Sequence, residues 1–148
     1  KEYTHLFWVD TDIVLPENAL SLLLASDKDI VSGVYISPFK YPGMVIKHPV
    51  AYQLTKDPNL RLPLQLPEME KETLMEMHSV GFGCCLIKRN VIEEVNLRRV
   101  GGTTSTEDVL FCVDAREKGH KTFLDTKVLC KHGVREGEIV EYLEIKGQ

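Results

Sequence analysis

The stretch Leu6-Phe7-Trp8-Val9-Asp10-Thr11-Asp12 joins an apolar run to two carboxylates one residue apart. In an extended segment, residues i and i+2 point to the same side, so Asp10 and Asp12 can converge on one bound species while Thr11 points away. Mg²⁺ and Mn²⁺ are usually held by one or two carboxylates together with substrate phosphates. In open α/β sheets, ligands bind beyond the carboxyl ends of strands, where these residues fall. Aspartates in this position also serve as turn and cap residues, so the pair alone leaves both readings open.

The composition is that of one soluble globular domain large enough to bury a core, with 148 residues of which 43% are hydrophobic. The formal net charge of −4 and the scattered basic residues argue against nucleic acid as a partner, because such binding needs clustered Lys and Arg. No apolar stretch approaches the roughly 18 residues that span a bilayer, and no charged-then-apolar leader marks secretion. We therefore expect a single cytoplasmic domain over residues 1–148 that binds no nucleic acid.

The first third of the chain predicts an α/β fold. Residues 3–9 form an apolar strand, a helix follows over about 17–26, and a Val- and Ile-rich strand covers 30–36. This β-α-β order predicts a parallel strand pair with a right-handed crossover. Residues 37–71 hold every proline except Pro16, with brief strands expected near 44–47 and 51–54. That segment is either a substrate-facing excursion or a plain surface loop.

The remaining elements are shorter but carry clear end signals. Extended segments at 75–80 and 84–88 flank Gly81-Phe82-Gly83, and Asn90 with Glu93 has the form of a capping box that opens a helix over 91–95. Several Thr and Ser residues can cap a helix over roughly 107–118, which Gly119 ends. Strands are expected at 121–124 and 127–131. The four cysteines, Cys84, Cys85, Cys112 and Cys130, lack the spacing of a disulfide framework and are expected to be buried thiols.

Two further sites are candidates for chemistry. Glu107 and Asp108 lie at the start of the second long helix, where acids also occur simply because the helix dipole stabilises them by about 0.3–1 kcal/mol each. His132 ends an apolar strand just before a glycine, a position that structural histidines also occupy. The position of these residues in the sequence does not by itself distinguish a catalytic or metal-binding role from a structural one.

Five segments, in this order along the chain, resemble the nucleotide-sugar glycosyltransferases of the GT-A fold, and most closely the inverting family-2 type. They are Phe7-Trp8-Val9-Asp10-Thr11-Asp12, Gly81-Phe82-Gly83-Cys84-Cys85-Leu86-Ile87, Ser105-Thr106-Glu107-Asp108-Val109-Leu110-Phe111-Cys112, Lys118-Gly119-His120-Lys121 and Val128-Leu129-Cys130-Lys131-His132. The resemblance spans roughly residues 5–133.

The resemblance implies a cofactor site for Mn²⁺ or Mg²⁺ that bridges the diphosphate of a nucleotide-sugar donor. By resemblance, Asp12 is the primary metal ligand, and Asp10 is its ribose-side or water-mediated companion in the Asp10-Thr11-Asp12 motif. His132 matches the late histidine that completes the metal site, and an imidazole ligand favours Mn²⁺ over Mg²⁺.

The resemblance also implies the catalytic residues. Asp108 matches the base that takes a proton from the acceptor hydroxyl, and Glu107 orients the acceptor or its loop. The implied enzyme moves a sugar to a glycan, lipid or protein acceptor with inversion, because attack occurs opposite the leaving group. General-base help of this kind is worth about 10²–10⁴ in rate.

One departure from the family pattern concerns the start of the chain. GT-A enzymes place βαβα structure before the aspartate pair, at about 30 residues per unit, whereas nine residues precede Asp10 here. We therefore expect the metal- and acceptor-binding C-terminal portion of a GT-A-like domain, a mixed sheet flanked by helices and truncated at its N-terminus. The strand over 3–9 would then expose an unpaired edge and could support self-association.

Two other functions remain open at this stage. A non-catalytic fragment would bind glycans or a protein through residues 37–71. A nucleotidyltransferase or phosphoesterase would use the same acids but would form no glycosidic bond.

Overall fold

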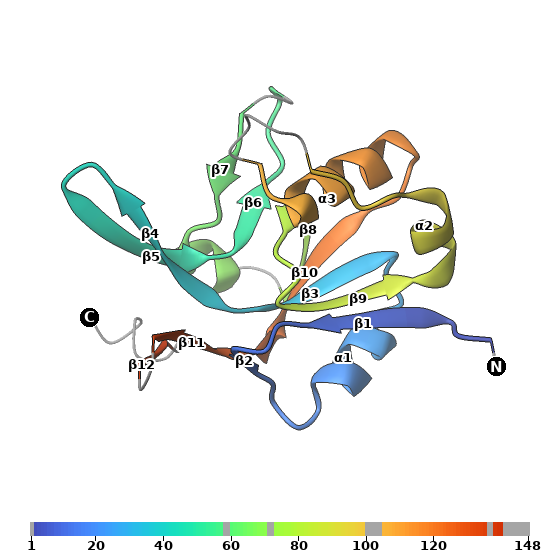
Figure 1. The fold of residues 1–148 in the computed structure, drawn as a ribbon, viewed down its shortest axis with the longest axis horizontal. Coiled ribbons are helices and arrows are strands. Elements are labelled where there is room, and N and C mark those ends of the chain that lie inside the picture. Colours follow the sequence, from blue (N-terminus) through green and yellow to red (C-terminus); the bar gives the residue numbers. More distant parts are fainter. Residues whose placement is uncertain (1, 58–59, 71–72, 100–104, 136–137, 141–148) are drawn as a thin grey trace.

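A mixed seven-stranded sheet forms the centre of the computed structural model, which describes residues 2–57, 60–70, 73–99, 105–135 and 138–140 (Figure 1). The order of its strands across the sheet is β1 (His5–Val9), β9 (Cys84–Lys88), β3 (Ile30–Val34), β10 (Thr122–Leu129), β8 (Leu74–Val80), β6 (Ala51–Gln53) and β7 (Leu62–Pro63). The predicted mixed α/β fold is thereby confirmed.

The strand neighbours differ from those expected for the opening β-α-β unit. β1 and β3 do not pair, because β9 lies between them and runs antiparallel to both. β9 is buried along nearly its whole length, which suits a central strand, whereas β1 is partly exposed and ends the sheet. The parallel partner of β3 is β10. The prediction of an adjacent parallel pair is therefore wrong, while the predicted edge position of the first strand is confirmed.

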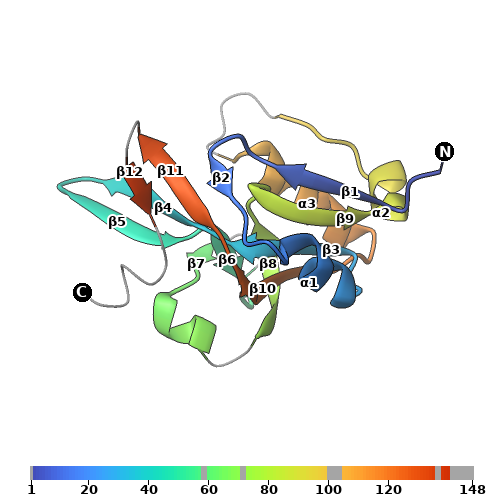
Figure 2. The ribbon, with the colours of Figure 1, turned by 90° about the horizontal axis from the view of Figure 1, so that it is seen from below.

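Two smaller sheets stand beside the main one. β4 (Ile36–Tyr41) and β5 (Met44–Pro49) form a hairpin that extends away from the body of the molecule (Figures 1 and 2). β2 (Ile13–Val14), β11 (Lys131–Arg135) and β12 (Glu138–Val140) form the other, with β11 in the middle. The proline-rich segment thus contains strands at both predicted places, in β5 and β6, and a 3-10 helix, η1 (Leu66–Glu70).

The helices begin and end close to their predicted positions. α1 (Ala19–Ala25) lies on one face of the sheet, and α2 (Arg89–Glu94) and α3 (Glu107–Glu117) lie on the other (Figure 2). The capping box predicted for α2 is wrong: its N-cap is Lys88, and Glu93 instead pairs with Arg89 at 2.6 Å. Gly119, at φ +91°, follows the C-cap of α3 as expected. None of the helices in the described ranges is long and apolar enough to cross a bilayer.

The two strands predicted near the C-terminus divide differently. β10 is continuous from Thr122 to Leu129, with an irregular register on β3 after Asp125, and the chain then enters β11. The irregular register lies where the chain begins to leave the main sheet for the small one. The break that we expected at residues 125–126 is part of the continuous strand β10.

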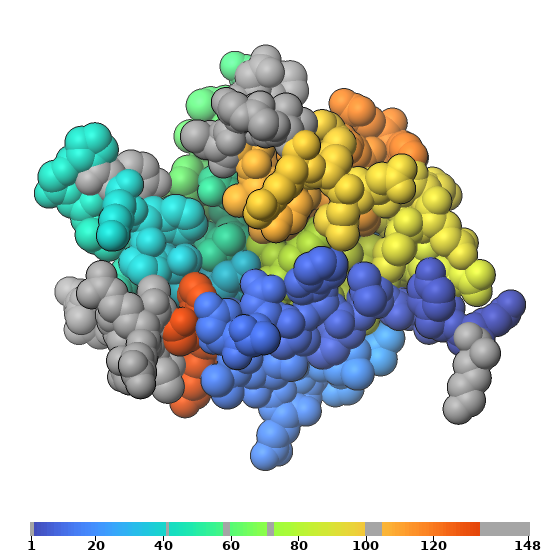
Figure 3. Space-filling view, viewed as in Figure 1, coloured from blue at the N-terminus to red at the C-terminus, as the bar shows by residue number. Residues whose placement is uncertain are grey.

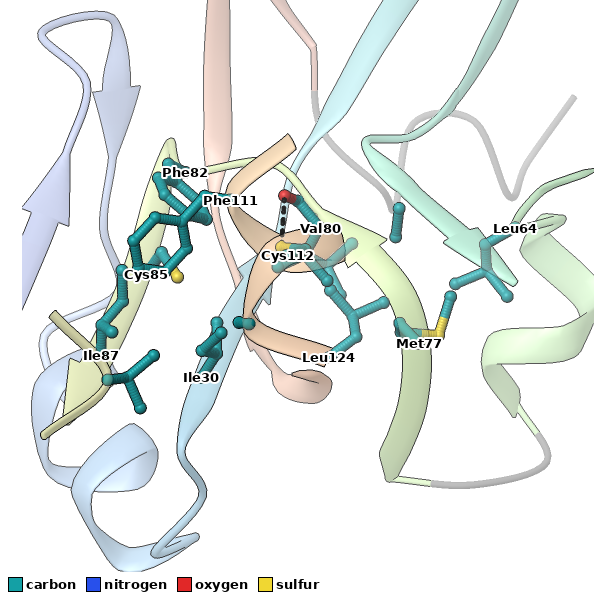
Figure 4. Close-up of a cluster of buried hydrophobic side chains, with 14 of the residues drawn as sticks. Ile30, Leu64, Met77, Val80, Phe82, Cys85, Ile87, Phe111, Cys112 and Leu124 are labelled. Atoms are coloured by element: carbon teal, nitrogen blue, oxygen red, sulfur yellow. Dashed lines mark hydrogen bonds between the residues drawn. The ribbon is translucent and has the colours of Figure 1, made fainter. Parts of the chain in front are cut away.

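Two apolar clusters fill the space on either side of the sheet. The larger one packs α2 and α3 against the sheet and contains Phe82, Cys85, Phe111 and Cys112 (Figure 4). The smaller one packs α1 against the opposite face. All four cysteines are buried with free thiols, as predicted.

Candidate functional site

A cleft of about 280 Å³ opens where β1 ends, and it brings the predicted site residues together. Asp10 and Asp12 line it from the turn after β1, Asp108 lines it from the first turn of α3, and His132 lines it from β11. These residues come from three distant parts of the chain. The end of β1 in the main sheet, β11 in the small sheet and the start of α3 meet around this cleft.

Backbone hydrogen bonds fix the aspartate turn between two strands. The N–H of Asp10 donates to the carbonyl of Gly83 at 3.1 Å, at the start of β9. The N–H of Gly133 donates to the carbonyl of Asp12 at 2.9 Å, and His132 lies opposite Ile13 in the β11–β2 register. The turn is thus held from both sides, which brings Asp12 beside His132.

The Asp12 and His132 side chains face each other across the cleft. Nε2 of His132 lies 3.4 Å from Oδ2 of Asp12, and Nδ1 lies 2.8 Å from the carbonyl oxygen of Ile36. Because a carbonyl only accepts, Nδ1 must carry the ring proton, and in the neutral ring Nε2 then presents a lone pair to the carboxylate. The Nε2 lone pair and the Asp12 carboxylate are both acceptors and repel each other at this distance. A metal cation between them, or a second proton on the ring, would remove the repulsion. A backbone carbonyl that orients the far nitrogen is the usual arrangement for a metal-binding histidine.

The donor set fits a divalent cation that also binds water and substrate. Within the described residues, no group of three or more His, Cys, Asp or Glu side chains forms a coordination shell by itself. However, adjacent ligands of an octahedral ion with bonds of about 2.1 Å lie roughly 3 Å apart, which is close to the spacing of Asp12 and His132. Mg²⁺ and Mn²⁺ sites commonly take their other ligands from water and phosphates, so a two-residue set is sufficient.

Asp10 and Thr11 have different positions. The indole Nε1–H of Trp8 donates to Oδ1 of Asp10 at 3.2 Å, which orients that carboxylate at the rim of the cleft. Thr11 is exposed and lies outside the cleft lining as expected, although residues 10–13 form a turn and not the extended segment from which this was predicted. The structure therefore gives Asp10, and not Thr11, access to a bound ligand.

The two acids at the start of α3 also have different surroundings. Oδ1 of Asp108 accepts the Val109 N–H at 2.7 Å and the Thr106 hydroxyl, and its side chain lines the cleft. Glu107 lies outside this cleft and pairs with Arg99, whose Nε is 3.2 Å from Oε2. A backbone N–H and the Arg99 guanidinium hold the pKa of Glu107 below its usual value. Of the two predicted catalytic acids, Asp108 lines the cleft, while Glu107 lines a smaller cavity beside it together with Asp10 and Asp108.

Tyr35 is a site residue that the sequence interpretation missed. Its buried ring meets the His132 ring edge-on at 5.5 Å, and its hydroxyl accepts the Gly83 N–H at 3.3 Å. A Cβ on Gly81 would lie 1.9 Å from the Tyr35 hydroxyl, and one on Gly83 would lie 2.8 Å from Cζ. Burial raises the pKa of the Tyr35 phenol above its usual value. The Gly-Phe-Gly spacing was the one available signal that a bulky side chain approaches the backbone here.

The chain is similar to known proteins at the level of structure. No protein-family model and no curated protein matches this chain. Among solved structures, the crystal structure of A197 from STIV is similar, with a TM-score of 0.55 and 17% sequence identity. The match covers 94% of this chain and 66% of that chain. At this identity the likeness shows a shared fold and nothing further.

Proposed function

We propose that this chain is the metal- and acceptor-binding portion of a metal-dependent glycosyltransferase domain, which moves a sugar from a nucleotide-diphosphate sugar to an acceptor hydroxyl, with inversion. The observation that carries the proposal is the convergence of Asp12, His132 and Asp108 on one cleft. The five ordered segments that resemble GT-A glycosyltransferases contain these same residues, and the mixed sheet agrees with that fold. The acceptor is a glycan, a lipid or a protein.

Asp12 and His132 are the residues that would hold Mn²⁺ or Mg²⁺, with Asp10 as a companion through water or the donor ribose. When bound, the cation would neutralise charge that develops on the diphosphate leaving group, with no proton transfer needed. Ile36 supports this role, because its carbonyl keeps Nε2 of His132 directed at Asp12. The imidazole ligand favours Mn²⁺.

Asp108 is the residue that we assign to the acceptor. Among the described residues, both hydrogen bonds of the Asp108 side chain end at Oδ1, so Oδ2 is the atom that would take the proton of the acceptor hydroxyl. The acceptor oxygen then forms a bond to the anomeric carbon as the bond from that carbon to the diphosphate oxygen breaks. The leaving diphosphate keeps the bonding electron pair, and attack from the opposite side inverts the centre.

The test separates metal binding from transfer. Binding of Mn²⁺, followed by electron paramagnetic resonance, should weaken about tenfold or more in Asp12→Ala and His132→Ala, since even supporting residues of metal sites cost 10–100-fold. Asp108→Asn should keep Mn²⁺ binding but abolish formation of a glycosidic bond, detected by mass spectrometry. Glu17→Ala, an exposed acid outside the cleft, is the matched control.

Other results would assign a different function. Mn²⁺ binding that is unchanged in Asp12→Ala would refute the proposal. Glycan or protein binding that needs no metal and is unchanged in Asp12→Ala and Asp108→Asn would instead support a non-catalytic module. A product that contains transferred nucleotide or free phosphate would support a nucleotidyltransferase or phosphoesterase.

A further inference from the structure

An apolar groove opens beside the cleft, on the face of the sheet that α2 and α3 cover. Its volume is about 180 Å³, and its walls come from β1, from α2 and the segment after it, and from the Phe82–Phe111 pair that Figure 4 shows. Asn96 is the one polar side chain among its described lining residues. The groove is therefore suited to a hydrocarbon group and offers little to a bare sugar.

A small cavity of about 160 Å³ lies between the groove and the cleft and shares lining residues with each of them. Trp8 and Phe82 line both the groove and this cavity, while Asp10 and Asp108 line both the cavity and the cleft. Figure 3 shows the resulting furrow between the blue atoms of β1 and the yellow atoms that follow α2. A ligand whose hydroxyl lies at Asp108 would therefore place its other end at the groove by crossing the border formed by Trp8 and Phe82.

Trp8 and Phe82 form the border between the groove and the small cavity, and each is held by a neighbouring residue. The Trp8 indole donates from its polar edge to Asp10 at 3.2 Å, and the Phe82 ring packs on it with centroids 5.9 Å apart. Phe82 in turn meets Phe111 edge-on at 5.5 Å. At the mouth, Leu6 and Leu97 are 39% and 48% exposed. Covering such apolar surface is favourable, so the groove gains from an apolar occupant.

We propose that this groove binds the apolar group of the acceptor, so that the acceptor is a hydroxyl compound bearing an aromatic ring or a short alkyl chain. The inference rests on the proposed function, because the position of Asp108 is what makes the occupant an acceptor. The size is adequate: an apolar cavity of roughly 150 Å³ lined by similar residues binds benzene, and this groove measures about 180 Å³.

Trp8 allows a direct test, because it is the single tryptophan of the chain and it lines the groove. Straight-chain alcohols with a terminal bromine quench tryptophan emission only on contact. Bromohexanol should quench Trp8 with a saturable component, whereas bromoethanol should quench by collision alone and show a linear dependence. Between bromobutanol and bromohexanol, affinity should rise about fourfold per methylene group.

A charged side chain at the mouth should remove this binding. Leu97→Asp should abolish the saturable quenching by bromohexanol. Leu24→Asp, at a leucine of similar exposure on α1, is the matched control and should leave it unchanged. The emission of Trp8 without alcohol and the urea midpoint of each variant show whether the fold is intact.

The outcomes distinguish the groove from the enzyme activity. Linear quenching by every alcohol, or saturable quenching that survives in Leu97→Asp, overturns the inference. Transfer of sugar to hexanol and ethanol at equal efficiency overturns it too, while sustaining the proposed function. Saturable quenching without any sugar transfer sustains an apolar binding site but overturns its assignment to an acceptor. Self-association in ultracentrifugation that Leu97→Asp abolishes would assign the groove to a second copy and overturn the inference.

Discussion

Gly81→Ala is the change for which the structure allows the sharpest calculation. A Cβ at this position would lie 1.9 Å from the hydroxyl of Tyr35 and 2.7 Å from Cγ1 of Val50, which is far inside contact distance. Tyr35 is 7% exposed, so its ring can move only against packed neighbours or into the cleft that it lines. Overpacking of this kind costs about 1–3 kcal/mol. Displacing the ring also breaks the hydrogen bond from the Gly83 N–H, at about 1 kcal/mol.

The expected loss in the free energy of unfolding is therefore about 2–4 kcal/mol, measured from urea curves at neutral pH with an unchanged m-value. Tyr35→Phe removes the oxygen that makes the shortest contact. In the double variant we expect Gly81→Ala and Tyr35→Phe to cost about 1 kcal/mol less than the sum of the single changes. This coupling assigns the cost to the phenol and not to the backbone.

Gly43→Ala serves as the control. Gly43 has φ +79° and no atom within 4 Å of an added Cβ, so alanine there incurs only the conformational cost of the left-handed region, about 1–2 kcal/mol. Gly81→Ala that costs no more than this control, or a double variant whose cost is additive, would refute the packing argument.

Three further predictions concern stability and thiol chemistry. Leu23→Ala should cost about 2–5 kcal/mol in urea unfolding because Leu23 is 1% exposed in the α1 cluster, whereas Leu24→Ala, at 44% exposure, should cost about 0.5 kcal/mol or less. Arg98→Ala should lower the free energy of unfolding slightly, because Arg98 Nε lies 2.6 Å from Asp114 and lowers the pKa of that carboxyl. The stabilisation is present above the usual Asp pKa of about 3.9, so the difference from wild type should vanish as the pH falls through the lowered pKa. Burial raises the pKa of the Cys112 thiol to about 12, so a disulfide reagent should label it only after unfolding in urea, as mass spectrometry of digested protein would show.

The parts of the site that follow from local pattern were predictable. Residues 10–12 follow an apolar strand, and the rule that ligands bind beyond strand ends placed them at the cleft. The start of helix α3 placed the two acids in its first turn, but choosing Asp108 as the base needed the family resemblance. His132 needed the family resemblance, since an apolar strand ending in histidine has no unique meaning by itself.

The parts that depend on distant pairing were not predictable. Strands 30–34 and 84–88 are both almost fully buried, so nothing local indicates that the later strand enters between β1 and β3. Glu107 and Asp108 are adjacent acids, and nothing in the sequence indicates that Glu107 pairs with Arg99 while Asp108 lines the cleft. Tyr35 was missed because the glycines that accommodate it lie in the connection between β8 and β9, which is distant from Tyr35 in the sequence.

The first strand explains why the cleft and the groove occur together. Alternation along β1 directs Trp8 toward the α2 and α3 cluster and Phe7 toward the α1 cluster. Immediately after β1 the chain turns back, with the Ile13 N–H donating to the Asp10 carbonyl at 3.1 Å, so Asp10 follows the groove wall directly. The hydrogen bond from Trp8 to Asp10 then couples the apolar wall to the acidic rim. A change in how the edge strand β1 is held would therefore alter both compartments at once, and the two proposed subsites cannot be tuned independently through this strand.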